Sequence, residues 1–385
     1  KLREIYGKIR KNVIEPITIR RTRSDLKNIP EYAADIAEQG IIFPEVKPPV
    51  KVEYIMDEAL NQLFYKTVFY LTDEDKLKYS RYQAIYGLKP EIQNKYYEQA
   101  ERVSKSLAFI MKTQLVKRLE SSFYAFRKSL VSFQIATDRM IEMFEKDKVF
   151  IAPDSDINKL LDKGWTDEDI EKEIERLGEE NPKNRTFKRE DFKPEFIEDL
   201  KKDAKLLNEL VLYWNTIDYD PKLDVFIAQL TRQFLNKKTN LEGKLVIFSE
   251  SFDTVDYLAK ALAKQGRKDV LVISSENRKR LYDTIVTNFD ANWDEEKQVS
   301  EYNIIITTEV LAEGVNLHRS NVIIHYDTPW NSTRLMQRIG RVNRIGTKAK
   351  AIYNYVFYPS AQGDSQIKLN KTAFMKIQAF HTAFG

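Results

Sequence analysis

Residues 303–327 read NIIITTEVLAEGVNLHRSNVIIHYD and contain two short apolar runs, each of which ends in polar residues. Three further runs of this kind are KLVIFS (244–249), DVLVISS (269–275) and AIYNYVFY (351–358). Helix-like amphipathic patterns lie between the runs, at residues 252–264, 277–289 and 331–344. Short unbroken valine and isoleucine runs joined by helices are typical of a parallel sheet covered on both faces. We therefore predict an α/β domain over residues 241–385.

The polar residues just past the predicted strands are the first candidates for a functional site. Sheets of this class bind ligands outside the carboxyl ends of their strands. Four residues occupy such positions: Ser249, Ser274, Thr308 and Asp327. For Thr308, a role as a helix N-cap explains the residue equally well.

The second candidate is the stretch QRIGRVNRIG, residues 337–346, which falls on a predicted helix. It carries three arginines at three-residue spacing: Arg338, Arg341 and Arg344. On a helix, these positions form one oblique stripe. An ordinary solvated face would normally interleave acids, but no acidic residue occurs anywhere in residues 328–363. Arginine forks match phosphate oxygens in a bidentate way, so we predict a phosphate-bearing partner.

Gly340 lies within the same predicted helix, where glycine costs ~1 kcal/mol relative to alanine. Close approach of a ligand or another surface would justify a residue without a side chain at this position.

Composition bounds the classes of protein to consider. A chain of 385 residues predicts two or three domains. With no cysteine, disulfides and thiolate metal sites are excluded, and the three histidines do not have the spacing of a metal cluster or a hydrolase triad. No apolar run reaches the length of a membrane span and no secretory signal is visible, so we expect a cytoplasmic protein without a membrane partner. The net charge of +4 requires any nucleic-acid affinity to be local.

We predict three regions along the chain. Residues 1–50 form a basic connector, residues 51–240 a mostly α-helical accessory or insertion domain, and residues 241–385 the α/β domain. Apolar residues recur every three or four positions in the stretches 61–71 and 108–133, as in long helices. The densely charged stretch 166–205 is predicted to be a solvated helical excursion.

Residues 307–317 (TTEVLAEGVNL) and 321–346 together resemble the fifth and sixth motifs of superfamily-two helicases, in particular of the bacterial Swi/Snf-type branch. That branch includes the RNA-polymerase-associated ATPases. The sixth motif reads Q-R-x-G-R-x-x-R, and five residues match it: Gln337, Arg338, Gly340, Arg341 and Arg344. The resemblance implies a RecA-like C-terminal helicase lobe in which Arg341 and Arg344 act as arginine fingers on the γ-phosphate of ATP.

The same resemblance implies roles for other residues. Gln337 would help to position the nucleotide together with Gly340, and Gly314 and Asn316 would lie beside its ribose. Four residues would face the nucleic acid, with Arg338 having a structural role as its alternative: Ser249, Thr308, Asn331 and Arg338. Asn331 belongs to DTPWN (327–331), which matches the D-x-P-W-N of the branch, although its Trp330 is equally consistent with core packing.

Two earlier stretches extend the resemblance. IRRTRSDL (19–26) resembles the element that follows the first motor lobe, and residues 112–130 resemble the helical segment between the lobes. Three positions depart from the pattern of the branch: Ser332, Met336 and Thr347.

The sequence contains no phosphate-binding loop of the form G-x-x-x-x-G-K-[ST]. Asp57 and Glu58 look like the acidic pair of such a motor, but the helical pattern that follows predicts acids in a first helical turn. The chain also begins at Lys1 rather than methionine. We therefore expect a fragment, the second half of a larger motor, whose first RecA-like lobe binds most of the ATP and Mg²⁺.

The sequence thus predicts one lobe of an ATP-dependent helicase or translocase, inactive as an ATPase by itself and without a metal site of its own. Expected partners are nucleic acid, preferentially double-stranded DNA, the first lobe of the same parent, and either RNA polymerase or a restriction or defence system. The alternative is a non-catalytic module that binds nucleic acid or protein through the basic surface 328–350. A nucleotide-sugar enzyme on a similar sheet lacks a suitably placed catalytic carboxylate.

Overall fold

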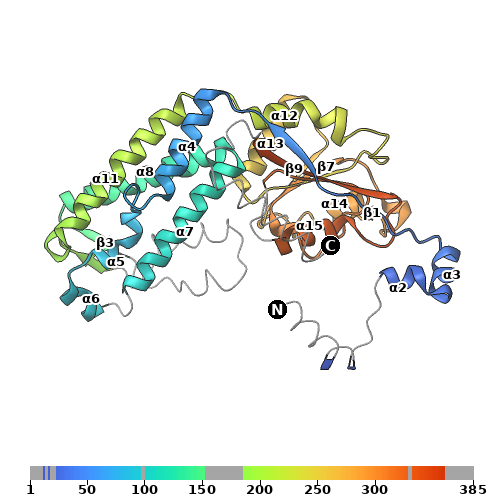
Figure 1. Ribbon diagram of the computed structural model, residues 1–385, viewed down its shortest axis with the longest axis horizontal. Helices are drawn as coiled ribbons and strands as arrows, with labels where there is room; N and C mark the ends of the chain where they lie inside the picture. The colour runs from blue at the N-terminus through green and yellow to red at the C-terminus, as the bar shows by residue number, and fades with distance from the viewer. Residues whose placement is uncertain are drawn as a thin grey trace.

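The computed structural model describes residues 12–13, 16–17, 23–96, 100–151, 185–327 and 332–359. Figure 1 shows a helical part on one side and a sheet with flanking helices on the other. Within the described residues, no helix is both long and apolar enough to cross a membrane.

All five strands predicted for the α/β domain are present and all run parallel. They are β5 (Leu245–Phe248), β6 (Val270–Ile273), β7 (Ile304–Thr307), β8 (Val322–His325) and β9 (Ala351–Pro359). Their order in the sheet is β9-β8-β5-β7-β6, so β5, although first in the chain, lies in the middle. The predicted fold class, a parallel sheet with flanking helices beside a mostly helical region, is confirmed.

Two further strands come from the region before the helical part. β1 (Glu45–Val46) and β2 (Val50–Tyr54) both pair in parallel with β9, on the side away from β8. In register, β2 runs from Val50 opposite Tyr355 to Tyr54 opposite Pro359. The sheet therefore takes in residues on both sides of the predicted boundary at residue 50.

Successive side chains of a strand point to opposite faces of the sheet. In this sheet, the side chains of both faces are buried. Leu245 and Ile247 of β5 join one apolar cluster, whereas Val246 and Phe248 join the other. Helix α13 (Phe252–Lys264) packs in the first cluster and coincides with its predicted range. The second cluster includes buried residues of α14 (Tyr282–Phe289) and α15 (Ser332–Val342). Two short 3-10 helices, η5 (Glu295–Lys297) and η6 (Glu309–Leu311), flank β7.

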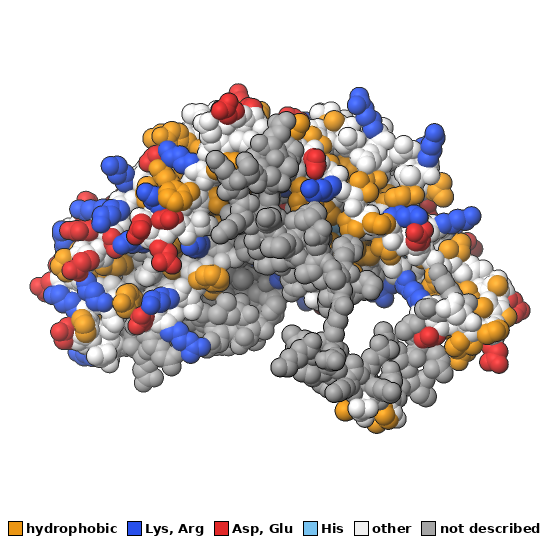
Figure 2. Space-filling view, in the orientation of Figure 1, with side chains coloured by type: hydrophobic (Ala, Val, Ile, Leu, Met, Phe, Trp, Pro, Cys, Tyr) orange, Lys and Arg blue, Asp and Glu red, His pale blue; other side chains and the backbone are white. Residues whose placement is uncertain are grey.

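The helical part is built from four long helices: α4 (Glu58–Thr72), α7 (Ala100–Ser121), α8 (Phe123–Glu145) and α11 (Pro194–Asn215). Trp214 is fully buried among them, and its ring packs against those of Phe123 and Phe126. Basic and acidic side chains intermingle over the face of this part shown in Figure 2, as expected for a solvated surface. Much of the charged stretch predicted as a helical excursion lies outside the described residues.

Shorter elements complete the described chain. Before the sheet come α2 (Arg23–Asn28) and α3 (Pro30–Glu38). The helical part also contains η2 (Ser80–Gln83), α5 (Ala84–Gly87), α6 (Pro90–Tyr96), η3 (Arg189–Asp191) and a hairpin of β3 (Val149–Ile151) with β4 (Arg185–Phe187). Helix α12 (Pro221–Gln229) and the single π-type turn η4 (Leu230–Phe234) lead into the sheet.

Asp57 begins α4 as its N-cap, because its carboxylate accepts a hydrogen bond from the backbone N–H of Leu60 at 2.8 Å. The prediction that Asp57 and Glu58 begin a helix is therefore confirmed.

Candidate functional site

Helix α15 follows β8 in the chain and carries Arg338 and Arg341, whereas Arg344 lies two residues beyond its end. Its apolar residues Leu335, Ile339 and Val342 are buried against the sheet. The predicted helix is confirmed, with ends at Ser332 and Val342. Three residues turn a helix by about 300°, so Arg338 and Arg341 point in different directions. The predicted stripe of three arginines on one helix is wrong at Arg344, because the helix ends at Val342. The structure separates their environments.

Arg338 is fully buried, and its guanidinium binds other buried residues of the α/β domain. Its Nε donates to Oε1 of Glu309 at 2.7 Å, Nη2 donates to the same oxygen, and the guanidinium lies 5.2 Å from the ring centroid of Phe248. Nη1 lies 3.4 Å from Nδ1 of His325, where burial and the charge of Arg338 hold the pKa of the imidazole well below its ordinary value. The predicted nucleic-acid contact of Arg338 is corrected to its structural alternative, because an enclosed guanidinium paired with Glu309 does not reach a ligand.

Arg341 and Arg344 are partly exposed and no carboxylate of the described residues forms an ion pair with them. Nη1 of Arg341 donates to the carbonyl of Val315 at 3.3 Å, and Nε of Arg344 donates to the carbonyl of Gly340 at 2.9 Å. Burial, and then the neighbouring charge of Arg344, lower the pKa of Arg341. The pair therefore concentrates positive charge at the surface of the lobe.

The loop between η6 and β8 lies beside α15 and contains two predicted residues, Gly314 and Asn316. Nε2 of Gln337 donates to Oε1 of Glu313 at 3.0 Å, next to Gly314. Gly314 has φ +79°, and a Cβ there would meet Nη2 of Arg278 at 2.3 Å, so glycine suits both the backbone and the space. Nδ2 of Asn316 donates to Oδ2 of Asp290 at 3.0 Å.

Gly340 has open space where a side chain would begin, with no atom of the described residues within 4 Å of an added Cβ. Packing among the described residues therefore does not explain a glycine in the last turn of α15.

Ser249 lies at the end of β5 as predicted, but it is fully buried. Its hydroxyl donates to Oδ2 of Asp327 at 2.6 Å, and the hydroxyl of Ser121 from α7 donates to the same oxygen at 2.6 Å. The backbone N–H of Glu250 donates to the same carboxylate. The predicted nucleic-acid contact of Ser249 is corrected to a structural role, because its hydroxyl belongs to this buried network.

Thr308 is 2% exposed and follows β7, as predicted. It occupies the N-cap position of η6, yet its side chain makes no capping hydrogen bond and its Oγ1 has no partner among the described residues. Asn331 and Trp330 lie outside the described residues.

The sequence-based interpretation gave no role to Glu309, which provides the counter-charge of Arg338 from a different element. It also did not connect Arg23 with α15. Nη2 of Arg23 donates to the carbonyl of Asn343, the residue after α15, at 2.8 Å. One signal for the role of Glu309 is charge balance, since a buried arginine requires an acidic partner. The sequence alone, however, does not show which arginine is buried.

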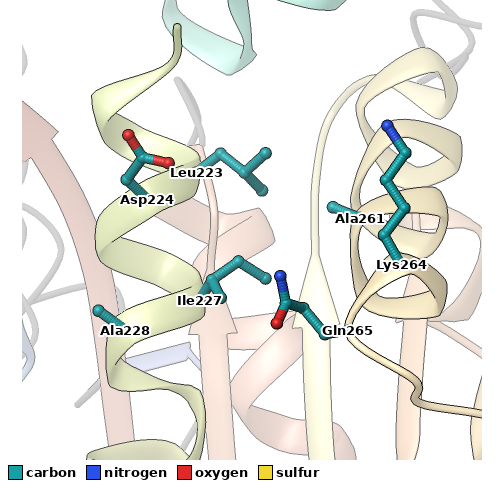
Figure 3. Close-up of a pocket in the computed structure, with 7 residues that line it drawn as sticks. All are labelled: Leu223, Asp224, Ile227, Ala228, Ala261, Lys264 and Gln265. Carbon is teal, nitrogen blue, oxygen red and sulfur yellow. The ribbon is translucent and has the colours of Figure 1, made fainter.

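Pockets in the described parts of the chain include two of similar volume. One, of about 320 Å³, lies between α12 and α13 and is lined by Leu223, Asp224, Ile227, Ala228, Ala261, Lys264 and Gln265. Figure 3 shows that its lining is largely aliphatic, and it contains none of the predicted site residues. The other, of about 260 Å³, is lined by Arg23, Asn292, Asn316, Arg344 and Ile345. The second pocket therefore coincides with the candidate site.

Residues 224–346 match the family model of the helicase conserved C-terminal domain. The chain is 26% identical over 189 residues to the uncharacterized ATP-dependent helicase YqhH of Bacillus subtilis, covering 47% of this chain and 31% of that protein. It is 27% identical over 157 residues to a probable eukaryotic initiation factor 4A of Trypanosoma cruzi, covering 41% and 35%. The alignments span about a third of the length of these curated relatives.

Among solved structures, the C-terminal part of the Fun30 ATPase domain aligns with 87% of this chain and 96% of that chain. The identity is 14% and the TM-score is 0.36, so no conclusion is drawn from that likeness. The family match includes η6, the following loop and all of QRIGRVNRIG. Residues 224–346 are therefore similar to a helicase C-terminal domain, and most of the candidate site lies within them.

Proposed function

We propose that this chain is the second motor lobe of an ATP-dependent translocase, in which Arg341 and Arg344 stabilise negative charge on the γ-phosphate of ATP. One observation carries the proposal: these adjacent guanidinium groups are partly exposed and have no carboxylate partner among the described residues. Charge spreads over the oxygens of the transferred phosphoryl group, so preplaced arginines accelerate hydrolysis, typically by about 10³-fold or more.

Neighbouring residues have proposed roles in the same site. Gln337 positions the nucleotide, and Gly314 and Asn316 border its ribose. Gly340 leaves room for the ligand or the first lobe, which fits the open space beside it. The first lobe of the parent binds most of the ATP and Mg²⁺, and this chain alone has no appreciable ATPase activity.

We propose double-stranded DNA as the track, on the resemblance of the connector and the helical segment to the Swi/Snf-type branch. Thr308 and Asn331 are the proposed contacts, with Thr308 retained because its hydroxyl has no partner among the described residues. The proposed setting is association with RNA polymerase or a restriction or defence system in the cytoplasm. Several relatives carry names of RNA helicases, so binding of duplex DNA and single-stranded RNA must be compared at the same salt concentration. Tighter binding to RNA would overturn the choice of DNA.

Steady-state ATP hydrolysis by the parent protein with both lobes tests the arginine roles. Arg341→Ala and Arg344→Ala should each lower kcat by about 10³-fold. Lys348→Ala is the matched control. Lys348 is exposed, and its substitution removes one positive charge from the same basic stretch. The control should retain turnover, and normal turnover by the Arg341→Ala parent would contradict the proposal.

A further inference from the structure

The pocket of about 260 Å³ beside α15 combines residues from distant parts of the chain. Arg344 comes from the end of the arginine stretch, Asn292 and Asn316 from loops, and Arg23 from α2, ahead of the whole sheet. The pocket therefore joins the connector to the candidate site, and its lining contains two cations and no acid.

Arg23 is held in place by contacts on two sides. Its Nη2 donates to the carbonyl of Asn343 at 2.8 Å, its Nη1 donates to Oδ1 of the same residue, and its guanidinium lies 5.6 Å from the ring centroid of Phe43. Arginine has five N–H donors, so these contacts leave some of them for a ligand.

The positive charges of Arg23 and Arg344 repel each other across the pocket. Burial, and then the charge of Arg344, lower the pKa of Arg23. Asp290 contacts two lining residues of the pocket: its carboxylate accepts from Nδ2 of Asn316 and from the backbone N–H of Asn292. One oxygen of this carboxylate lies 3.6 Å from Nδ1 of His318. Asp290 thus orders the loops and pairs with neither arginine of the pocket.

The donors of the pocket favour an anion over a neutral ligand. Nδ2 of Asn292 donates to the carbonyl of Ile345 at 3.0 Å, so this amide, like that of Asn316, is already engaged. On Arg344, only Nε has a hydrogen-bond partner among the described residues. The donors that remain therefore belong chiefly to the two guanidinium groups, whose geometry matches phosphate oxygens.

We propose that Arg23 and Arg344 together bind a phosphoryl group of a nucleoside polyphosphate, so that the connector supplies a third arginine to the site. This inference rests on the proposed function and adds a ligand contact to it. The volume suits one or two phosphoryl groups, since sites that enclose drug-sized ligands measure roughly 300–1,000 Å³. The simpler alternative is that Arg23 only caps the C-terminus of α15 through Asn343.

Calorimetric titration of the 385-residue chain with inorganic pyrophosphate tests the pocket without requiring catalysis. Arg23→Ala and Arg344→Ala should each weaken binding at least tenfold, which corresponds to about 1.4 kcal/mol. Arg189→Ala is the matched control, because Arg189 is exposed in the helical part, and it should bind like the unaltered chain. Arg23→Lys keeps the charge but loses the fork, so it should also weaken binding.

Circular dichroism of each variant separates binding from folding. A lower melting temperature of Arg23→Ala with unchanged pyrophosphate affinity would support the capping role and overturn the proposal. Titrations with ATP and with orthophosphate compare the affinity of the pocket for a nucleotide with its affinity for free phosphate. The affinity for each of these ligands should fall in Arg23→Ala. Displacement of pyrophosphate by a DNA duplex would assign the pocket to nucleic acid and overturn the choice of ligand. Loss of pyrophosphate binding in Arg344→Ala but not in Arg23→Ala would reject the role of Arg23 and leave the proposed function intact.

Discussion

The three arginines of residues 337–346 share one sequence pattern but occupy three environments. Arg338 is enclosed with Glu309, Arg341 contacts the loop after η6, and Arg344 lines a pocket with Arg23. A buried ion pair contributes little net stability by itself, because removal of both charges from water is costly. Removal of either Arg338 or Glu309 alone, however, would leave the charge of the other buried without a counter-charge.

Glu309→Ala should therefore destabilise the chain by about 3–5 kcal/mol, because it leaves the charge of Arg338 buried without a counter-ion. Urea unfolding measures this change. The matched control is the double variant Arg338→Met with Glu309→Leu, which removes both charges and should recover much of the lost stability. A loss below about 1 kcal/mol in Glu309→Ala would show that Arg338 is neutralised by another group.

Gly340 offers a test in which stability and activity should change in opposite directions. Its backbone does not have a positive φ, and an added Cβ meets no atom within 4 Å. Gly340→Ala should thus stabilise the isolated chain by about 1 kcal/mol through helix propensity alone. In the parent protein the same methyl group should lower ATP hydrolysis if a ligand or the first lobe approaches this surface.

Thermal unfolding of the isolated chain and steady-state kinetics of the parent measure the two effects of Gly340→Ala. Gly314→Ala is the contrasting variant, because φ +79° and the nearby Arg278 make it destabilising. Unchanged turnover in the Gly340→Ala parent would remove Gly340 from the proposed site.

At the scale of elements, α12 connects the helical part to the sheet through Lys222. This side chain is buried, and its Nζ donates to the carbonyls of Glu120 and Ser121 at 2.9 and 2.7 Å, at the C-terminus of α7. It also lies 4.3 Å from the ring centroid of Tyr326, just past β8. A single amine therefore stabilises the contact between the two parts of the molecule.

Burial lowers the pKa of Lys222 to about 8, although the charges of Asp327, Asp220 and Glu120 oppose the shift. The unfolded chain keeps this proton up to about pH 10.5, so the unfolded state binds more protons and stability rises with pH above 8. The contribution between pH 8 and 10 is about 2 kcal/mol.

Lys222→Met should flatten the rise in unfolding free energy between pH 8 and 10, measured by urea titration at several pH values. Lys264→Met changes an exposed lysine of α13 and should retain the rise. An equal slope in Lys222→Met and the unaltered chain would show that another group, such as Lys244 with its pKa also lowered to about 8, causes it.

Elements whose formation is local could be predicted from the sequence. The five strands and α13 follow from apolar periodicity and from a serine N-cap at Ser251. The break between α7 and α8 was missed, although Ser122 carries the signal, since its hydroxyl accepts from the N–H of Ala125 at 3.1 Å. Pairings between distant elements, such as Arg338 with Glu309, were not predictable because periodicity does not state which partner faces a given side chain.

At the scale of the whole molecule, the sheet is completed by strand β2, which precedes the helical part in the sequence, whereas β5 to β9 follow it. β2 pairs with β9, and the side chains of Val52 and Tyr54 are 5% exposed in the core that also contains Phe357. Without β1 and β2, β9 would pair only with β8 and would be an edge strand. The backbone groups along its other side would then be exposed, as a template for aggregation. The strands β1 and β2, before position 55, thus belong to the fold of the α/β domain.

Val52→Asp tests this dependence within the full chain. The substitution buries a carboxylate that has no partner, so it should destabilise the chain by at least about 3 kcal/mol and lower the midpoint of thermal unfolding. Glu53→Gln changes the neighbouring residue on the exposed face of β2 and should leave the midpoint nearly unchanged. If β2 were an appendage rather than part of the sheet, Val52→Asp would melt like the control. A single cooperative transition at lower temperature would instead show that the connector and the helicase lobe fold as one unit.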